Sequence, residues 1–433
     1  MYRKVILTNG IRLVTERIPT VKSVTIGLWV NAGSRDEHPE EAGYSHFIEH
    51  MLFKGTASRS ATDISREIDA LGGEMNAFTT RETTTFYVKV LDQHLPQALD
   101  LLSDLFLHSR LHQKEIEKEK QVVLEEIRMV QDDPEDLIQE LHAKLVMGTH
   151  PLSRPILGKA STILHIRRQD LLEYMDRHYR PEGIVVAVAG NFDQSKLEKM
   201  MTRLFGRYQA SKTTDSGTRW PAELHGGVTL KQKPLEQVHL CVGLQGIAAG
   251  HKDRYVIYAI NSVLGGSVSS RLFQEIREKR GLSYSIYSFL SGYSDTGTVT
   301  VYAGTRAGEV ARVLDLIHRE IQKMAGRGVT SEELKRTKEQ MKGGLMLSLE
   351  SSHSRMNKLA KDELIAGTHT SLEEMISDID AVTEQQVRRV ARSLFTIENM
   401  AMTGLGPLSP RQIEGLRQRF PLSITSSRGS ARA

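Results

Sequence analysis

The stretch Gly73-Glu-Met-Asn-Ala-Phe-Thr-Thr80 is followed by the β-branched run Thr83-Thr-Thr-Phe-Tyr-Val-Lys-Val90, and this succession decides the fold of the 433-residue chain. A helical pattern of apolar residues comes next, over residues 96–107. The same succession returns in the second half of the sequence, at residues 281–288, 297–304 and 309–324. Internal similarity of this kind predicts two tandem domains of the same fold.

Two further pairs of apolar runs support the repeat. Residues 24–30 correspond to residues 238–244, and the glycine-bounded run 183–190 corresponds to residues 399–405. Short runs rich in β-branched residues are typical of buried strands. We therefore predict an α+β fold with two tandem, structurally similar domains, each of them a mostly antiparallel sheet covered by helices.

The segment between the two halves is polar and carries Gly217 and Pro221, which are features of a linker. The sequence then predicts four parts in chain order: an N-terminal domain of residues 1–210, a linker of residues 211–224, a C-terminal domain of similar fold at residues 225–425 and a disordered tail at residues 426–433.

Composition excludes several classes of protein. Hydrophobic residues at 39% and charged residues at 25% are typical of a soluble globular chain. The net charge of +4, with both signs interspersed, gives no basic stripe for nucleic acid. We find no secretory signal and no long apolar span, so we expect a cytoplasmic protein without a membrane partner. With Cys241 as its single cysteine, the chain must bind any metal through His and carboxylate side chains.

The motif His46-Phe-Ile-Glu-His50 carries the chemistry of the first half. In a helix that Ser45 helps to start, His46 and His50 project from one face, so that both imidazoles can share a divalent cation. The Glu49 carboxylate can then reach a water held by that cation without being a ligand. This His-x-x-Glu-His pattern is the inverted zincin motif. A pair of core histidines is the alternative, because the neighbouring residues are apolar.

A third metal ligand is expected on the helical pattern of residues 114–130. The residues three and four positions from Glu126 are apolar, so its carboxylate is expected on the core-facing stripe: Val122, Val123, Met129 and Val130. Glu119, seven residues earlier, shares that stripe. Two inward-facing carboxylates call for a cation or a hydrogen-bonded outer shell. We predict Glu126 as the ligand and Glu119 as the supporting residue.

The combined spacing of His46, Glu49, His50 and Glu126, with Glu119 before it, resembles that of the pitrilysin family of inverted-zincin zinc metallopeptidases. This family includes insulin-degrading enzyme, the mitochondrial processing peptidase and bacterial processing proteases. The resemblance covers nearly the whole chain. It implies one Zn²⁺ per chain and Glu49 as the general base.

The resemblance extends to two accessory segments. The family carries an Asn in a segment like 73–80, and an Arg followed seven residues later by a Tyr. The resemblance thus implies substrate binding by Asn76, Ala77 and Phe78, and it implies catalytic contacts from Arg277 and Tyr284. Each has a structural alternative: Asn76 as turn chemistry, Tyr284 as a packed strand aromatic, and Arg277 as a charge at a helix C-terminus.

The function that the resemblance implies is a zinc endopeptidase that cleaves unfolded peptides or presequence-like segments in an enclosed chamber. The N-terminal domain would be catalytic, and the C-terminal domain would contact the substrate. The resemblance also implies a clam-like homodimer, or a heterodimer with a paralogue, in which Arg277 and Tyr284 act either within their own chain or across the pair. A non-catalytic partner subunit is the alternative, although such subunits lack the motif. A structural zinc protein would need a fourth ligand.

Overall fold

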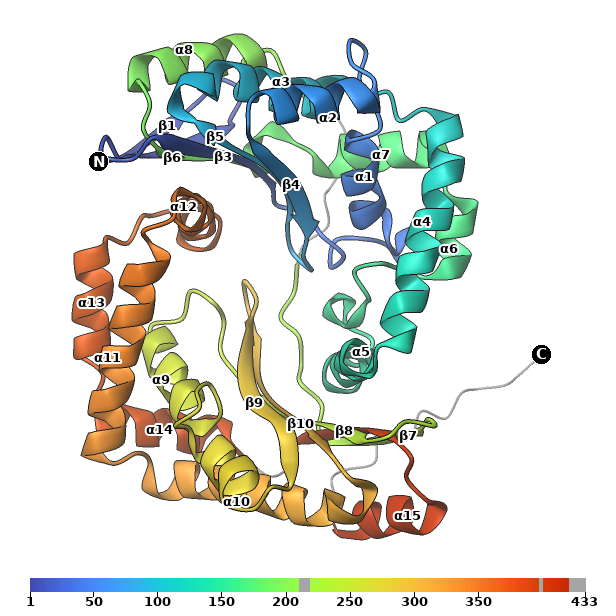
Figure 1. Ribbon diagram of the computed structural model, residues 1–433, viewed down its shortest axis with the longest axis vertical. Coiled ribbons are helices and arrows are strands. Elements are labelled where there is room, and N and C mark those ends of the chain that lie inside the picture. The colour runs from blue at the N-terminus through green and yellow to red at the C-terminus, as the bar shows by residue number, and fades with distance from the viewer. Residues whose placement is uncertain (210–218, 397–399, 420–433) are drawn as a thin grey trace. The chain divides into compact units, whose positions relative to one another are not determined.

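The computed structural model describes residues 1–209, 219–396 and 400–419 (Figure 1). Its contacts divide the chain into two compact units. The first unit comprises residues 1–129, 154–219 and 344–370, and the second comprises residues 130–153, 220–343 and 371–433. The predicted tail, 426–433, and residues 211–218 of the predicted linker lie outside the described residues. Among the described helices, none is both long and apolar enough to cross a membrane.

The first unit is built on a six-stranded sheet with the strand order β1-β2-β6-β3-β5-β4. Neighbouring strands are antiparallel except β2 and β6, which run parallel. Strand β4 forms one edge of the sheet, where it pairs with β5. The strands are β1 (Tyr2–Ile6), β2 (Arg12–Arg17), β3 (Ser23–Val30), β4 (Glu74–Thr79), β5 (Thr84–Leu91) and β6 (Ile184–Gly190).

The second unit repeats this sheet with five strands in the order β7-β11-β8-β10-β9. Its one parallel pair is β7 and β11, which take the places of β2 and β6. Strands β8, β10 and β9 likewise correspond to β3, β5 and β4, so the predicted repeat and the mostly antiparallel sheets are confirmed. The strands are β7 (Gly227–Gln232), β8 (Val238–Gln245), β9 (Ser283–Gly292), β10 (Gly297–Thr305) and β11 (Ala401–Gly406).

Helices cover both faces of the first sheet. The larger core lies on the face that packs against helices α1 to α4 and α6 to α8, and the smaller core lies on the other face, against α12 (Figure 1). There the Trp29 indole N–H donates to Sδ of Met356 over 3.4 Å. The helices are α1 (Tyr44–Leu52), α2 (Ala61–Ala70), α3 (Leu95–His108), α4 (Gln113–Asp132), α6 (Ala160–His165), α7 (Arg168–His178), α8 (Gln194–Phe205) and α12 (Ser352–Ala366).

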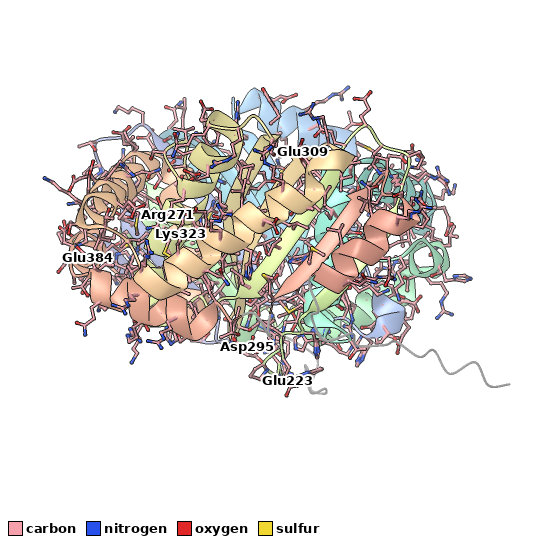
Figure 2. The ribbon with its side chains drawn as sticks, turned by 90° about the horizontal axis from the view of Figure 1, so that it is seen from below. Glu223, Arg271, Asp295, Glu309, Lys323 and Glu384 are labelled. Atoms are coloured by element: carbon pink, nitrogen blue, oxygen red, sulfur yellow. The ribbon has the colours of Figure 1, made fainter. Side chains whose placement is uncertain are left out.

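The second sheet is covered in the same way. Helices α9, α10 and α14 pack on one face, where Figure 2 shows α10 crossing the sheet between Glu309 and Lys323. Helix α5 packs on the other face against Cys241, which is buried as the sequence predicts. The helices are α5 (Pro134–Met147), α9 (Arg254–Leu264), α10 (Val310–Arg327), α11 (Ser331–Ser348), α13 (Leu372–Asp380), α14 (Glu384–Leu394) and α15 (Pro410–Arg419).

The two compact units differ from the predicted contiguous domains, 1–210 and 225–425, in two segments. Residues 130–153, from the first half of the sequence, belong to the second unit, and residues 344–370 belong to the first. The physical reason is that each sheet has two apolar faces, and each second face is covered by a helix from the other half of the sequence. Helix α5 contacts β8 and β11, whereas α12 contacts β6 and β3.

Candidate metal centre

Helix α1, which carries the His-x-x-Glu-His motif, starts at a glycine and a buried carboxylate. Its N-cap, Gly43, has a φ of 100°, which is unfavourable for residues with a Cβ. The Glu37 carboxylate accepts the backbone N–H groups of Gly43 at 2.9 Å and of Ser45 at 2.8 Å. The prediction that Ser45 starts the helix was therefore wrong. The Ser45 hydroxyl is buried against the Tyr174 hydroxyl instead, at 2.7 Å.

Three side chains from two helices meet beside α1. Nε2 of His46 and Nε2 of His50 lie 3.2 Å apart, and Oε2 of Glu126 lies 3.7 Å from the first and 3.6 Å from the second. Ligand atoms of a tetrahedral zinc ion are about 3.4 Å apart when each lies about 2.1 Å from the metal. The structure thus brings the three predicted ligands together at separations that suit one small divalent cation.

The chemistry of these donors also fits a cation. Oε2 of Glu126 is buried and has no hydrogen-bond partner among the described residues. Burial, and then the nearby His50, lower the pKa of His46 to about 3, so its imidazole is neutral and can act as a ligand. Buried polar atoms are rarely left without a partner, which disfavours a plain pair of core histidines. In the described part of the chain, no other group of three His, Cys, Asp or Glu side chains converges in this way.

Glu119 stands behind His50. Its Oε1 lies 2.8 Å from Nδ1 of His50, and its Oε2 lies 2.7 Å from Nζ of Lys54. Burial alone would raise the pKa of Glu119, but the hydrogen bonds to His50 and Lys54 outweigh it and lower the pKa. A carboxylate that accepts Nδ1–H leaves the Nε2 lone pair of the imidazole free for a metal. The structure therefore places Glu119 where a supporting residue is expected, and it adds Lys54, which the sequence reasoning missed.

Glu49 lies on α1 between the two histidines but is bound to the sheet. Its Oε2 accepts a 2.5 Å hydrogen bond from the hydroxyl of Thr79, the last residue of edge strand β4. Burial raises the pKa of Glu49, and the bond from Thr79 opposes this shift. The sequence reasoning also missed Thr79. Strand alternation could have found Thr79, because Ala77 and Met75, two and four residues earlier, pack into the core that contains α1.

The predicted reason for choosing Glu126 was wrong for two of its four apolar neighbours, although the position of Glu126 agrees with the choice. The buried stripe of α4 runs through Ile116, Glu119, Val123 and Ile127. Val122 and Met129, which were expected in the core, are 44% and 65% exposed. Glu126 lies at the margin of the buried stripe because each residue turns the helix by about 100°. From this margin its carboxylate reaches the two histidines, while the Glu126 side chain as a whole stays 35% exposed.

The three residues expected to bind substrate follow one another on β4 but differ in setting. Asn76 is exposed, and its Oδ1 accepts the Ala77 backbone N–H at 2.8 Å. Ala77 packs against the larger core, whereas Phe78 faces the opposite side of the sheet and packs edge-on to Trp29 at 5.5 Å between ring centroids. Among the described residues, no strand pairs with the outer edge of β4.

Arg277 and Tyr284 belong to the second unit, where they contact each other. Arg277 lies in a π-helical turn, Phe273–Glu278, and its Cζ is 4.8 Å from the Phe273 ring centroid and 4.7 Å from that of Tyr284. Tyr284, on edge strand β9, is 75% exposed, so the alternative of a packed aromatic was wrong. Phe273 was not foreseen. The turn and the two rings fix the guanidinium.

In a comparison with known protein families, two family models together match most of the chain. The model described as Insulinase (Peptidase family M16) matches residues 12–160, and the model described as Peptidase M16 inactive domain matches residues 165–341. The candidate metal centre lies within the first match. In the second unit, α9 occupies the place of α1 and carries neither His nor Glu.

Similar proteins share this length. A protein of Bacillus subtilis named as an uncharacterized zinc protease is 44% identical over 94% of this chain and 98% of its own length. One of Streptomyces coelicolor with the same description is 40% identical over 96% of this chain and 91% of its own length.

Solved structures share the fold. A Helicobacter pylori protease has a TM-score of 0.87 at 22% identity and covers 94% of this chain and 99% of its own. A peptidase M16 inactive domain from Pseudomonas fluorescens has a TM-score of 0.88 at 20% identity and covers 94% of this chain and 98% of its own.

Proposed function

The chain belongs to peptidase family M16, the insulinase family, and we propose that it is a zinc-dependent endopeptidase. The observation that carries the proposal is the convergence of Nε2 of His46, Nε2 of His50 and Oε2 of Glu126, with Glu49 on the same helix turn. The names of its relatives as zinc proteases support the choice of metal. The match to an inactive domain spans only residues 165–341, which exclude these four side chains.

The first unit supplies the groups that a metal-assisted hydrolysis needs. When bound, zinc acts as a Lewis acid and lowers the pKa of a coordinated water from 15.7 to about 7. Two imidazoles and one carboxylate would hold the ion and leave a fourth position for that water. Glu49 would take the proton from the attacking water and deliver it to the leaving amine. The Thr79 hydroxyl, which donates to Oε2 of Glu49, would hold this carboxylate in place for both transfers.

Strand β4 supports an extended peptide as substrate. Its outer edge offers backbone N–H and C=O groups, so a peptide added as a further strand would be held by its main chain and with little dependence on side chains. This favours unfolded peptides, presequence-like segments among them. Asn76 is exposed on the same strand and can orient the peptide backbone.

Arg277 and Tyr284 would complete the chemistry as hydrogen-bond donors to the developing oxyanion. Their exposed position on and beside β9 leaves them free to contact a substrate. We propose that two chains assemble around the substrate, as an identical pair or with a paralogue, and that these donors act within one chain or across the pair. A non-catalytic partner subunit is the second candidate, and the presence of all four motif side chains disfavours it.

The test is cleavage of unstructured peptides, followed by mass spectrometry, with zinc-loaded and chelated protein. We expect cleavage only with zinc. The variant Glu49→Gln should lose about 10²- to 10⁴-fold in rate while its zinc content stays at the wild-type level. Glu125→Gln is the matched control, because Glu125 is exposed on α4 and pairs only with Arg128 in the described structure. Equal cleavage by chelated protein, or by Glu49→Gln, would overturn the proposal.

A further inference from the structure

Behind His50, two charged side chains form a chain of contacts that ends at Lys54. Nδ1 of His50 lies 2.8 Å from Oε1 of Glu119, and Oε2 of Glu119 lies 2.7 Å from Nζ of Lys54. Each carboxylate oxygen of Glu119 therefore has its own cationic or N–H partner. The Glu119 side chain is 5% exposed, whereas that of Lys54 is 32% exposed, so the chain of contacts runs from the metal centre towards solvent.

The burial of Glu119 makes its second partner necessary. A buried carboxylate loses most of its hydration, and this loss must be offset by charged or hydrogen-bonding groups. One bond from His50 would leave Oε2 without a donor. With Lys54 on Oε2, the carboxylate is held at both of its oxygens, and Oε1 remains directed at Nδ1 of His50.

The backbone around Lys54 is fixed on both sides. Its own N–H donates to the carbonyl of Met51 at the end of α1, at 3.1 Å, and the following Gly55 has a φ of 112°. The Gly55 carbonyl accepts the N–H of Arg110 at 3.1 Å. Further on, Arg59 forms ion pairs of 2.8 Å with both Asp100 and Asp104 of α3. The ammonium group is thus presented to Glu119 from an ordered turn.

We propose that Lys54 is a positioning residue of the metal centre and acts on zinc binding through Glu119. The inference deepens the proposed function and rests on it. Lys54 does not touch the reacting atoms. It holds the Glu119 carboxylate in the orientation that engages Nδ1 of His50, so that the Nε2 lone pair of His50 is available to the ion.

The direction in which zinc affinity changes when Lys54 is removed distinguishes a positioning role from simple charge repulsion. A positive charge close to a cation site repels the cation, so removing it should tighten zinc binding if Coulomb repulsion is all that matters. Loss of a residue that positions Glu119 should weaken zinc binding instead. Outer-shell changes of this kind cost about 10- to 100-fold in metal affinity.

The experiment measures zinc affinity of the full-length protein by competition with a chromophoric chelator, without any activity assay. We expect Lys54→Met, which keeps the aliphatic stem, to bind zinc about tenfold more weakly. Lys118→Met should stay within about twofold of wild type. Lys118 is the matched control, because it is 70% exposed on α4 beside Glu119 and pairs with Glu115.

A double-variant comparison shows whether Lys54 acts through Glu119. Glu119→Gln alone should weaken zinc binding by about 10- to 100-fold, and Lys54→Met in that background should add no further loss. Unchanged or tighter zinc binding by Lys54→Met would overturn the inference, as would losses that multiply in the double variant. Neither result would touch the proposed peptidase function, which depends on Glu49 and the three ligands. If Lys54→Met is unstable, Lys54→Ala takes its place in both comparisons, and the same outcomes decide.

Discussion

The Thr79 hydroxyl donates a 2.5 Å hydrogen bond to Oε2 of Glu49, which ties the edge strand β4 to the helix that carries the metal motif. Thr79→Val keeps the shape of the side chain and removes the donor. A hydrogen bond to a charged group contributes about 1.5–3 kcal/mol, so we expect kcat to fall by about 10- to 100-fold. Zinc content should not change. Thr79→Ser restores the hydroxyl and should recover most of the rate, and wild-type kcat in Thr79→Val would show that the bond has no role in turnover.

Zinc should stabilise the first unit, because it binds the folded arrangement of two helices and has no such site in the unfolded chain. A ligand at 100 times its Kd adds about 2.7 kcal/mol to the free energy of unfolding. We expect the chelated protein to unfold at a lower temperature or denaturant concentration than the zinc-loaded form.

The variant His50→Gln checks that this stabilisation comes from the proposed site. It should abolish the difference between chelated and loaded protein, which can be followed by thermal unfolding with tyrosine and tryptophan fluorescence. A zinc-dependent shift of wild-type size in His50→Gln would place the ion elsewhere.

Gly43 should be sensitive to substitution, since it holds the first turn of α1. Its φ is 100°, and a Cβ would lie 2.7 Å from the Leu157 carbonyl oxygen and 2.8 Å from Cδ1 of Ile163. We expect Gly43→Ala to lower the free energy of unfolding by at least about 2 kcal/mol, because strained φ and overpacking add. Gly343→Ala is the control, as a Cβ there meets nothing within 4 Å in helix α11, and it should stabilise by about 0.5–1 kcal/mol. Urea unfolding of both variants checks the contrast.

Much of this architecture could be predicted from the sequence, because the deciding signals are local. The repeat of strand patterns gave both sheets, and the spacing of His46, His50 and Glu126 gave the three atoms that converge. Helical periodicity was less reliable. It placed Val122 and Met129 in the core, although both are exposed, since a stretch of adjacent apolar residues does not define which of them faces inward.

The remaining features depend on contacts between distant parts of the chain. Glu37 caps α1 from outside the helix, and Thr79 reaches Glu49 from a strand that follows it by thirty positions. No local sequence pattern predicts that α5 packs on the second sheet and α12 on the first. This packing follows from the second apolar face of each sheet, which only the assembled fold reveals.

The buried His142 should make stability depend on pH. Burial lowers its pKa to about 4 from an ordinary value of 6.5, while Nδ1 lies 3.0 Å from the Thr403 hydroxyl. Between pH 6.5 and about 4, His142 is protonated in the unfolded chain and neutral in the folded chain. The contribution of neutral His142 to the free energy of unfolding is therefore full above pH 6.5 and is lost as the pH falls towards 4.

The loss over this window is about 3 kcal/mol. His142→Asn, whose amide can keep the contact with Thr403, should remove that part of the pH dependence. Urea midpoints of wild type and variant at pH 7 and pH 4.5 measure the difference between them. An equal fall in the urea midpoint of wild type and variant between pH 7 and pH 4.5 would contradict the prediction.

The exchanged helix α12 makes a prediction about fragments. A fragment of residues 1–219 contains every strand of the first sheet but lacks residues 344–370, which belong to the same unit. It would expose the apolar face formed by Val14, Trp29, Tyr87, Val185 and Ala187, against which Met356 and Leu359 pack. An exposed patch of this kind favours association, so we expect the fragment to self-associate and to bind a hydrophobic dye.

Fusing residues 344–370 to this fragment through a flexible linker should lower its dye binding and self-association and give a cooperative unfolding transition, with α5 the one remaining described helix whose sheet partner is missing. The rescue should depend on Met356, which is fully buried and accepts a hydrogen bond from the Trp29 indole N–H. Met356→Asp in the same fusion places a charge against that indole and should abolish the rescue, since an unpaired buried charge costs several kcal/mol. Size-exclusion chromatography and urea unfolding of the three proteins make the comparison. A fragment 1–219 that is monomeric and as stable as the fusion would mean that α12 is not needed for the first unit to fold.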